Sequence, residues 1–163
     1  MKTPKPPDSM RSALMSRVRQ KGTSAELAVG AALRSLGLSY RLNVRALPGS
    51  PDFANRSAKW GVFVHGCFWH HHTNCKRATV PKTNEHFWRT KFAANRVRDA
   101  KAIRSMRGSG FRLAVIWECE TENPITLHAK LLHILEPRRI NMGEPINHRR
   151  VVMDIAGLRS RRG

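Results

Sequence analysis

Residues 65–75, with the sequence HGCFWHHHTNC, hold two of the three cysteines and four of the eight histidines of the chain. Within them, Cys67, His72 and Cys75 have the residue types and the short spacing of a tetrahedral zinc site, which binds thiolate sulfur and imidazole nitrogen. The remaining cysteine, Cys119, lies in the segment FRLAVIWEC and can supply a fourth ligand. The alternative is a buried thiol pair beside solvent-exposed histidines, but short Cys/His tracts with this spacing favour a metal site.

A second set of residues could hold a catalytic metal ion. Asp52 follows a proline at the start of a predicted strand, where a carboxylate near a sheet edge can bind a divalent cation such as Mg²⁺. Many nucleases place a second acid and a lysine on the next strand, but the next predicted strand, KWGVFVHG, has no acid and its only lysine is at its start. We expect the backbone carbonyl of Val64 to complete the metal shell. The alternative is that Asp52 only forms a turn after the proline.

Two histidines lie where the second acid would be expected. His65 ends the predicted strand, and His70 follows in the loop. Imidazole can accept a proton from water near neutral pH or donate one to a leaving oxygen. We therefore predict that imidazole chemistry replaces the second half of the usual metal site. The alternative for His70 is a further zinc-ligand candidate or a solvated side chain.

Phe68 and Trp69 are adjacent in the same loop, so they cannot both point easily into a core. Apolar side chains of this kind can insert between stacked bases, at an unstacking cost of a few kcal/mol. Met15, on a predicted N-terminal helix, could enter from the opposite groove. The alternative for Trp69 and Met15 is a place in the hydrophobic core.

The charge of the chain indicates a polyanionic partner. Thirty Lys and Arg residues against eleven Asp and Glu residues give a formal net charge of +19, for which nucleic acid is the first candidate and an anionic membrane surface the rival. No segment reaches the roughly 18 apolar residues of a membrane span, and the N-terminus has no apolar signal-peptide core. We expect a cytoplasmic protein, in which reduced cysteines bind metal more often than they form disulfides. A basic ribosome-associated protein would leave the four Trp, the six Phe and the His/Cys motif unexplained.

The sequence pattern predicts a flexible arm at 1–9, one folded domain at 10–136 and a basic tail at 137–163. The pattern predicts helices at 10–18, 24–36, 84–106 and 124–135, and strands at 38–44, 52–54, 60–64, 111–117 and 151–155. Thr23 and Glu26 have the spacing of a capping box, Gly37 ends the helix, and Thr83 is a candidate cap for the long helix. This order of elements predicts an α/β fold, a mixed sheet flanked by helices.

The two predicted helices that face the core differ in composition. The expected apolar positions are Leu27, Ala31, Leu33 and Leu36 in the first, and Phe87, Trp88, Phe92, Val97 and Ile103 in the long helix. The rest of the long helix is strongly basic. A face that follows DNA phosphates is the favoured interpretation, and a solvated face is the alternative.

Several of these segments together resemble one family of DNA repair enzymes. The segments are MRSALMSRVRQKGTSAEL (10–27), PGSPDF (48–53), HGCFWHHH (65–72), VPKTNEHFW (80–88), KFAANRVRD (91–99) and FRLAVIWEC (111–119). They resemble the very-short-patch mismatch repair endonucleases over about residues 9–136. The resemblance implies a restriction-endonuclease-like fold with a structural zinc site. It also implies a Mg²⁺-dependent, strand-specific nick 5′ to the thymine of a T·G mismatch, the product of 5-methylcytosine deamination. Double-stranded DNA with such a mismatch would be the partner, together with other repair proteins.

The resemblance also implies roles for individual residues. Asp52 would be the carboxylate that binds Mg²⁺, beside the Val64 carbonyl. His70 would be the general base, and His65 would lie close to the cleaved phosphate. Glu26 would be an acid in the outer shell of the metal ion, in addition to its capping role. The remaining residues are the intercalating Phe68, Trp69 and Met15, the base-facing Lys91 and Asn95, the accessory acid Asp99, and the zinc ligands Cys67, His72, Cys75 and Cys119.

The step between the last histidine and the second cysteine is longer here than in the family pattern. Counting forward from Cys67 selects His72 as the ligand, whereas counting back from Cys75 selects Thr73, which is chemically poor. His71 is the fallback ligand.

Two other functions compete with the nicking enzyme. A zinc-stabilised binder of mismatched or bent DNA would need neither Asp52 nor His70. A nuclease that cuts both strands would need a dimer or a second site, whereas the sequence shows one site and predicts a monomer.

Overall fold

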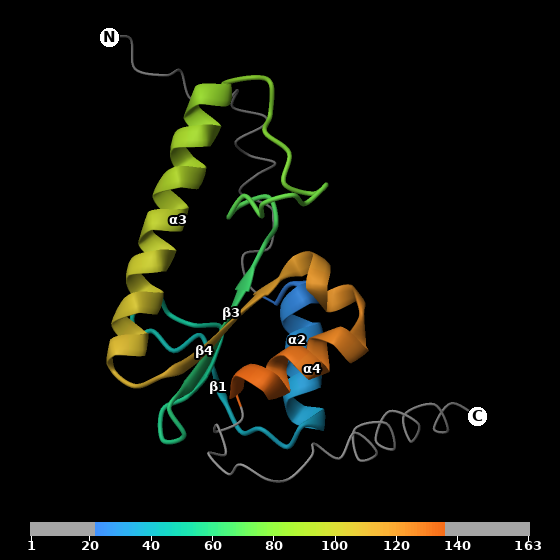
Figure 1. Cartoon of the computed structure of the whole chain (residues 1–163), viewed down its shortest axis with the longest axis vertical. Coiled ribbons are helices and arrows are strands. Elements are labelled where there is room, and N and C mark those ends of the chain that lie inside the picture. The colour runs from blue at the N-terminus through green and yellow to red at the C-terminus, as the bar shows by residue number, and fades with distance from the viewer. Residues whose placement is uncertain (1–21, 136–163) are drawn as a thin grey trace, which may run out of the picture.

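Four strands form the centre of the protein in a computed structural model that describes residues 22–135 (Figure 1). The strands are β1 (Arg41–Leu42), β2 (Phe53–Asn55), β3 (Trp60–His65) and β4 (Arg112–Trp117), in that order across the sheet. β2 runs antiparallel to β1 and to β3, whereas β3 and β4 are parallel. The predicted mixed α/β sheet is therefore confirmed. The arm at 1–9, the helix at 10–18 with Met15, the tail at 137–163 and the strand at 151–155 lie outside the described residues.

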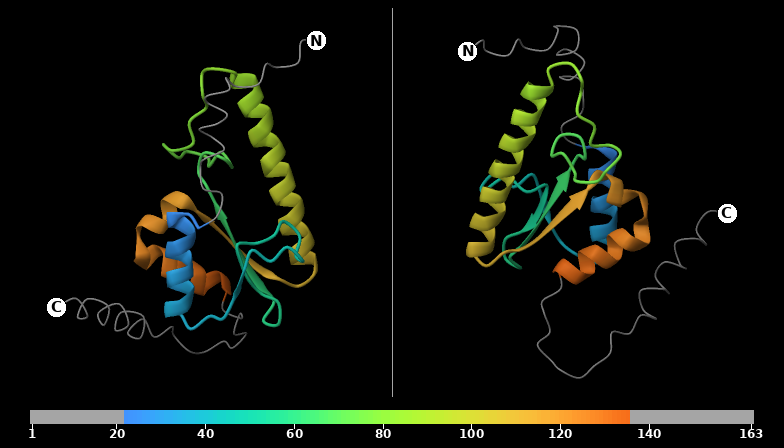
Figure 2. Two further views of the ribbon diagram at one scale, coloured as in Figure 1. Left: turned by 180° about the vertical axis from the view of Figure 1, so that it is seen from behind. Right: turned by 45° about the horizontal axis from the view of Figure 1, so that its top comes forward.

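Helices cover both faces of this sheet. They are α2 (Ser24–Ser35), α3 (Glu85–Gly108) and α4 (Pro124–Leu135), with a short 3-10 helix, η1 (Glu118–Glu122), after β4. α3 crosses from the end of β3 to the start of β4 and lies on one face, while α2 and α4 lie together on the other (Figures 1 and 2). None of the helices described in residues 22–135 is long and apolar enough to cross a membrane.

β3 and β4 are buried on both faces, as strands between two helical layers must be. Side chains alternate along a strand, so Val62 and Ile116 join the core under α2 and α4. Phe63 and Leu113 point to the other face, where they contact Met106 of α3. Both strands are thereby held in place up to their ends, where the candidate site begins.

α2 begins with the predicted capping box. The Thr23 hydroxyl accepts a hydrogen bond from the Glu26 N–H at 3.2 Å, and the Glu26 carboxylate accepts one from the Thr23 N–H. The predicted apolar stripe was partly wrong, because Leu27 is 66% exposed and Ala31 is also exposed. The inward positions are the ones that follow Ala25 at helical spacing, namely Val29, Ala32 and Leu33.

α3 also differs from its prediction. Asn84, in the left-handed conformation, precedes the helix without a side-chain cap, so Thr83 is not the N-cap. Val97 is 70% exposed and does not face the core. The inward positions follow a regular spacing of three or four residues. They are Trp88, Phe92, Asn95, Asp99, Ala102 and Met106.

Candidate active site and metal centre

The loop that leaves β3 carries two clusters of side chains with metal-binding or proton-transfer chemistry. One consists of Cys67, His72, Cys75 and Cys119, and the other of His65, His70 and Asp99. In each cluster the candidate ligand atoms lie within 4.8 Å of one another. Together the clusters draw on β3, the loop, α3 and η1, so that Asp99 and Cys119 come from positions well beyond the loop in sequence.

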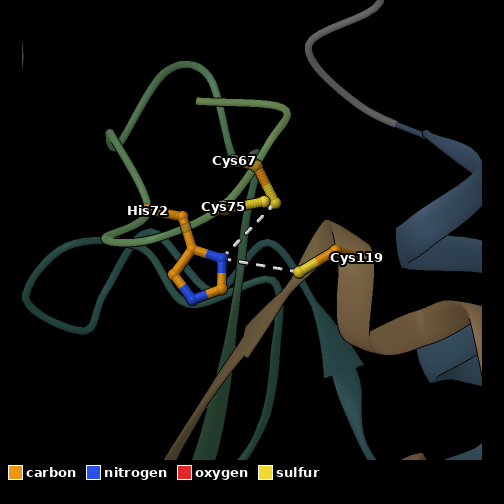
Figure 3. Close-up of side chains that lie close together, drawn as sticks. All are labelled: Cys67, His72, Cys75 and Cys119. Atoms are coloured by element: carbon orange, nitrogen blue, oxygen red, sulfur yellow. Dashed lines mark hydrogen bonds between the residues drawn. The ribbon is translucent and has the colours of Figure 1, made fainter. Parts of the chain in front are cut away.

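The first cluster brings four side chains of the types that bind zinc close together (Figure 3). Nδ1 of His72 lies 3.7 Å from Sγ of Cys67 and 3.4 Å from Sγ of Cys119. Zinc bonds of about 2.3 Å to sulfur and about 2.0 Å to nitrogen, at tetrahedral angles, separate such atoms by about 3.5 Å. The two distances from His72 therefore match those around a zinc ion, and Cys75 completes the set of four candidate ligands.

The surroundings of the three thiols shift their pKa values in different directions. Burial raises the pKa of Cys67 to about 12 and is the main cause of the raised pKa of Cys119. The pKa of Cys75 is lowered, chiefly by a backbone hydrogen bond at Arg77. A bound metal ion would stabilise the thiolates, because coordinating thiols give up their protons.

His71, the fallback zinc ligand, lies outside this cluster. Its ring stacks on Phe92 of α3, with centroids 5.1 Å apart and planes within 3°. The ring of His72 stacks instead on Trp117, the last residue of β4, at 4.1 Å and 4°. The backbone of His71 is left-handed, with φ of 48°, and this turn directs the two neighbouring imidazoles to different places.

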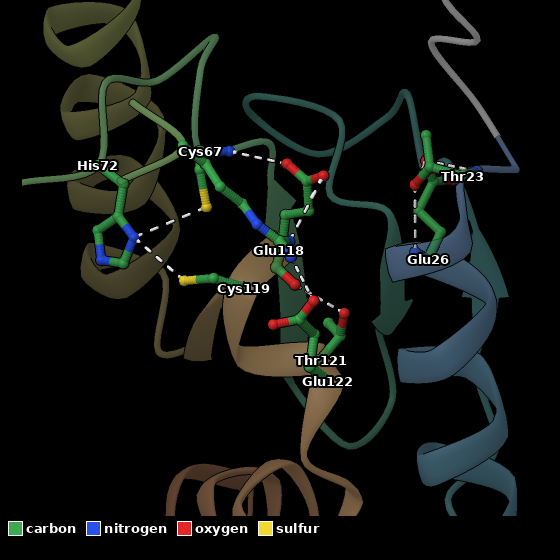
Figure 4. A network of polar contacts seen from close by, with 9 residues as sticks. Thr23, Glu26, Cys67, His72, Glu118, Cys119, Thr121 and Glu122 are labelled. Atoms are coloured by element: carbon green, nitrogen blue, oxygen red, sulfur yellow. Dashed lines mark hydrogen bonds and ion pairs between the residues drawn. The ribbon is translucent and has the colours of Figure 1, made fainter. Parts of the chain in front are cut away.

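A polar network ties the loop to η1 independently of any metal (Figure 4). The Cys67 N–H donates to Oε2 of Glu118 at 3.3 Å. Arg77 forms ion pairs with Glu118, at 3.9 Å, and with Glu122. Thr121 donates its hydroxyl proton to the Glu118 carbonyl at 2.8 Å, which helps to hold η1 in its tight turn.

The second cluster contains an oriented histidine. Nδ1 of His70 lies 2.5 Å from Oδ2 of Asp99, so the carboxylate accepts the Nδ1 proton, and Nε2 is the acceptor whenever the ring is neutral. The ring of His65 stacks on that of His70, with centroids 3.9 Å apart and planes within 7°. His65 is only 7% exposed. The geometry suits a base whose ring is held from two sides.

Electrostatics assign different roles to these side chains. Burial, followed by the charge of His70, lowers the pKa of His65 to about 4, so His65 is neutral at neutral pH. Burial alone would raise the pKa of Asp99, but its hydrogen bond with His70 and the nearby positive charges lower it overall. Asp99 is therefore the anion that holds His70 in one tautomer.

Asp52 lies at the edge of this cluster. Its Oδ2 accepts a hydrogen bond from the Val64 N–H at 2.7 Å. Burial is the main cause of its raised pKa, and the charge of Glu26 adds to the increase, while that of His70 opposes it. The N–H and C=O of one strand residue point to the same edge, so the Val64 carbonyl also faces Asp52. A carboxylate and a carbonyl are oxygen ligands that suit Mg²⁺.

Glu26 is engaged in the α2 cap. Its Oε1 accepts hydrogen bonds from the backbone and hydroxyl of Thr23, and its Oε2 accepts one from the Gly22 N–H. Its negative charge nevertheless reaches Asp52. Glu26 thus combines a capping role with an acidic position near the cluster.

Comparison with known proteins adds the decisive observation. Residues 5–77 match the family model described as DNA mismatch endonuclease Vsr. The chain is 37% identical over 109 residues to DNA mismatch endonuclease Vsr of Escherichia coli, an alignment that covers 67% of this chain and 69% of the relative. This chain is an endonuclease of the Vsr family.

Other relatives of the family are type II nicking enzymes. V.XorIIP of Xanthomonas oryzae is 42% identical over 76% of this chain and 90% of its own length, and V.NmeAIP of Neisseria meningitidis is 37% identical over 76% and 87%.

In this Vsr family member, the two loop aromatics are packed against α3. The ring centroid of Phe68 lies 5.4 Å from that of Trp88 and 5.3 Å from that of Phe92. Trp69 lies edge-on to Phe68 at 5.1 Å. Neither loop residue is fully buried. They form a half-exposed aromatic cluster at one end of α3, and Trp88 belongs to it although the sequence pattern indicated only a core position.

Lys91 and Asn95, the two residues expected to face bases, both contact this aromatic cluster. Nζ of Lys91 lies 5.5 Å from the ring centroids of Trp69 and Trp88 and 5.7 Å from that of Phe87. The Asn95 amide donates to the Trp69 carbonyl at 2.9 Å. Both side chains therefore contact Trp69 and hold it against α3.

Proposed function

We propose that this endonuclease cuts one strand of duplex DNA 5′ to the thymine of a T·G mismatch, requires Mg²⁺ and so starts very-short-patch repair. The observation that carries this proposal is the His70–Asp99 hydrogen bond, 2.5 Å long, beside the half-buried carboxylate of Asp52. A protein that only bound DNA would need neither group. The family membership supports a mismatch as the substrate. We also propose a restriction-endonuclease-like fold, because a mixed sheet presents Asp52 and His65 at one end of neighbouring strands.

Asp52 and the Val64 carbonyl would hold Mg²⁺, with Glu26 as an acid in the outer shell. When bound, the ion would neutralise charge that develops on the phosphate oxygens and acidify a bound water. His70, oriented by Asp99, accepts a proton from the attacking water at Nε2. The neutral His65 lies against His70, where it can contact the cleaved phosphate without competing for that proton.

The zinc ligands and the aromatic cluster serve this chemistry indirectly. Zinc on Cys67, His72, Cys75 and Cys119 would fix the loop on both sides of His70. Phe68 and Trp69 would enter the base stack at the mismatch, because rings held against α3 lose little freedom on binding. Lys91 and Asn95 would then exchange their contacts with the rings for contacts with the bases.

The test uses two 5′-labelled duplexes that are identical except for one T·G mismatch, each with and without Mg²⁺. We expect one nick, beside the mismatched thymine, only with Mg²⁺ and only in the mismatched duplex. Asp52→Ala is the matched control, which should abolish the nick and leave binding largely intact. Tight mismatch binding by the wild-type protein without a nick would instead support a binding module, and cutting of both strands of the matched duplex would support a restriction-type nuclease. Either result would overturn the proposal.

A further inference from the structure

Three exposed basic side chains form a line along α3: Lys91, Arg98 and Lys101. Arg98 follows Lys91 by seven residues, which is close to two helical turns, and Lys101 follows three residues later. The line begins at the aromatic cluster, because Lys91 lies over the rings of Trp69 and Trp88. From Lys91 to Lys101 it extends about 15 Å along the helix.

Arg98 lies at the exposed edge of the His65, His70 and Asp99 cluster. Its side chain is 70% exposed, and its Nε is 3.8 Å from Oδ1 of Asp99. The other oxygen of Asp99 is occupied by His70. Within residues 22–135, no hydrogen bond is formed by the two terminal nitrogens of Arg98. These nitrogens are therefore available to a ligand beside the proposed catalytic base.

Within residues 22–135, the contact between Arg98 and Asp99 is the one ion pair that an acidic residue forms with this line. Each of the other carboxylates there has a partner elsewhere: Glu26 in the α2 cap, Asp52 at Val64, Glu85 on Arg89, Glu118 and Glu122 on Arg77, and Glu120 on Lys130. The exposed groups of Arg98 and Lys101 thus form a positively charged surface that continues directly from the site.

We propose that Arg98 and Lys101 bind DNA backbone phosphates next to the cleaved bond, as a continuation of the contact made by Lys91. This inference rests on the proposed function, because it takes the duplex to lie on the catalytic cluster. A guanidinium presents paired donors that match two phosphate oxygens, and Lys101 adds a point charge. Because Arg98 and Lys101 are neighbours three residues apart on the helix surface, each can contact a different phosphate of one strand, which makes two contacts in all.

The experiment measures binding to a matched duplex by fluorescence anisotropy between 50 and 200 mM NaCl. The variant is Arg98→Gln with Lys101→Gln. The matched control is Arg96→Gln with Arg107→Gln, two exposed arginines of the same helix, three turns apart, on a line that faces away from the first. The slope of log K against log salt is negative, and each lost phosphate contact should make it less steep by about 0.9. The variant should therefore be less steep than the wild type by about 1.8, and the control should keep the wild-type slope.

Two further variants show whether the effect is specific. Lys101→Gln alone should lose about half of the slope change, and Arg98→Lys should recover the slope but not the full affinity, because lysine cannot bind two oxygens in one plane. Equal slopes for the variant and its control would overturn the inference. Nicking of the T·G duplex is measured separately. A slope difference without wild-type nicking would reject the proposed function and keep the phosphate line, whereas nicking with equal slopes would reject the line alone.

Discussion

The two side-chain clusters at the end of β3 share one loop and differ in almost every other respect. The Cys67, His72, Cys75 and Cys119 cluster has four donors, three of them sulfur, and a geometry that closes around one ion. The His65, His70 and Asp99 cluster has no sulfur, and its hydrogen bond and stacked rings fix one histidine with a free nitrogen. His70 lies between Cys67 and His72 in sequence. We therefore expect the first cluster, called the anchoring cluster below, to set the position of the second, called the reactive cluster.

The largest expected effect comes from removing a donor of the anchoring cluster. Cys67→Ala should lose the metal and lower the melting temperature by more than about 10 °C, because structural zinc couples to folding. Zinc content by mass spectrometry and calorimetry would measure both. His71→Ala is the control, since this imidazole stacks on Phe92 outside the cluster, and it should retain zinc. Complete metal loss with an unchanged melting temperature would contradict the anchoring role.

A substitution at Asp52, beside the reactive cluster, should abolish most of the activity and yet stabilise the fold. Asp52→Asn should reduce single-turnover nicking by about 10³-fold, because the carboxylate that would hold Mg²⁺ is gone. Its melting temperature without divalent metal should rise at pH 7. Burial raises the folded-state pKa of Asp52 above its unfolded value, so stability is fully present below the unfolded pKa and falls as pH rises through the folded one. A lower melting temperature for the variant at pH 7 would contradict this sign.

A smaller effect is expected for the residue that orients the base. Asp99→Asn should reduce nicking by about 10²-fold, because the amide can stabilise the wrong His70 tautomer. Zinc content should not change, since Asp99 lies outside the other cluster. Rates measured at saturating protein separate this loss from weaker binding. An unchanged rate would mean that the His70–Asp99 contact is not used in the reaction.

The smallest effect concerns the α2 cap. Thr23→Ala should reduce stability by about 1 kcal/mol, with the loss of the hydrogen bond to the Glu26 N–H. Thermal melting would show this decrease, while nicking at low temperature should stay close to wild type. A loss of nicking as large as that of Asp99→Asn would show instead that the cap fixes Glu26 for the reactive cluster.

Part of this structure could be predicted from residues that are close together in the sequence. The capping box of α2 and the bounds 124–135 of the last helix were predicted correctly, because each depends on residues close in sequence. Residue type and spacing also selected the four zinc-ligand candidates, which the structure brings together. The roles assigned to these residues and to the arm, domain and tail stay predictions.

The face of α3 shows why other features were not predictable. A search for apolar spacing selects Val97, yet the inward face passes through Asn95 and Asp99, two polar residues between Phe92 and Ala102. Hydrophobic periodicity fails there because those positions face the candidate site rather than the core. The strand predicted at 38–44 is similarly reduced to Arg41–Leu42, since Asn43 has a positive φ and turns the chain. Contacts such as that of Asn95 with the Trp69 carbonyl depend on tertiary packing, which spacing does not reveal.

The parallel pairing of β3 and β4 has a consequence for how the protein is made. Parallel neighbours need a crossover, here α3, so Cys119 leaves the ribosome well after Cys67, His72 and Cys75. Until β4 has been synthesised and paired, the loop lacks its fourth ligand and α3 lacks the strand on which it packs. A growing or truncated chain that ends before Cys119 would therefore hold no assembled nuclease.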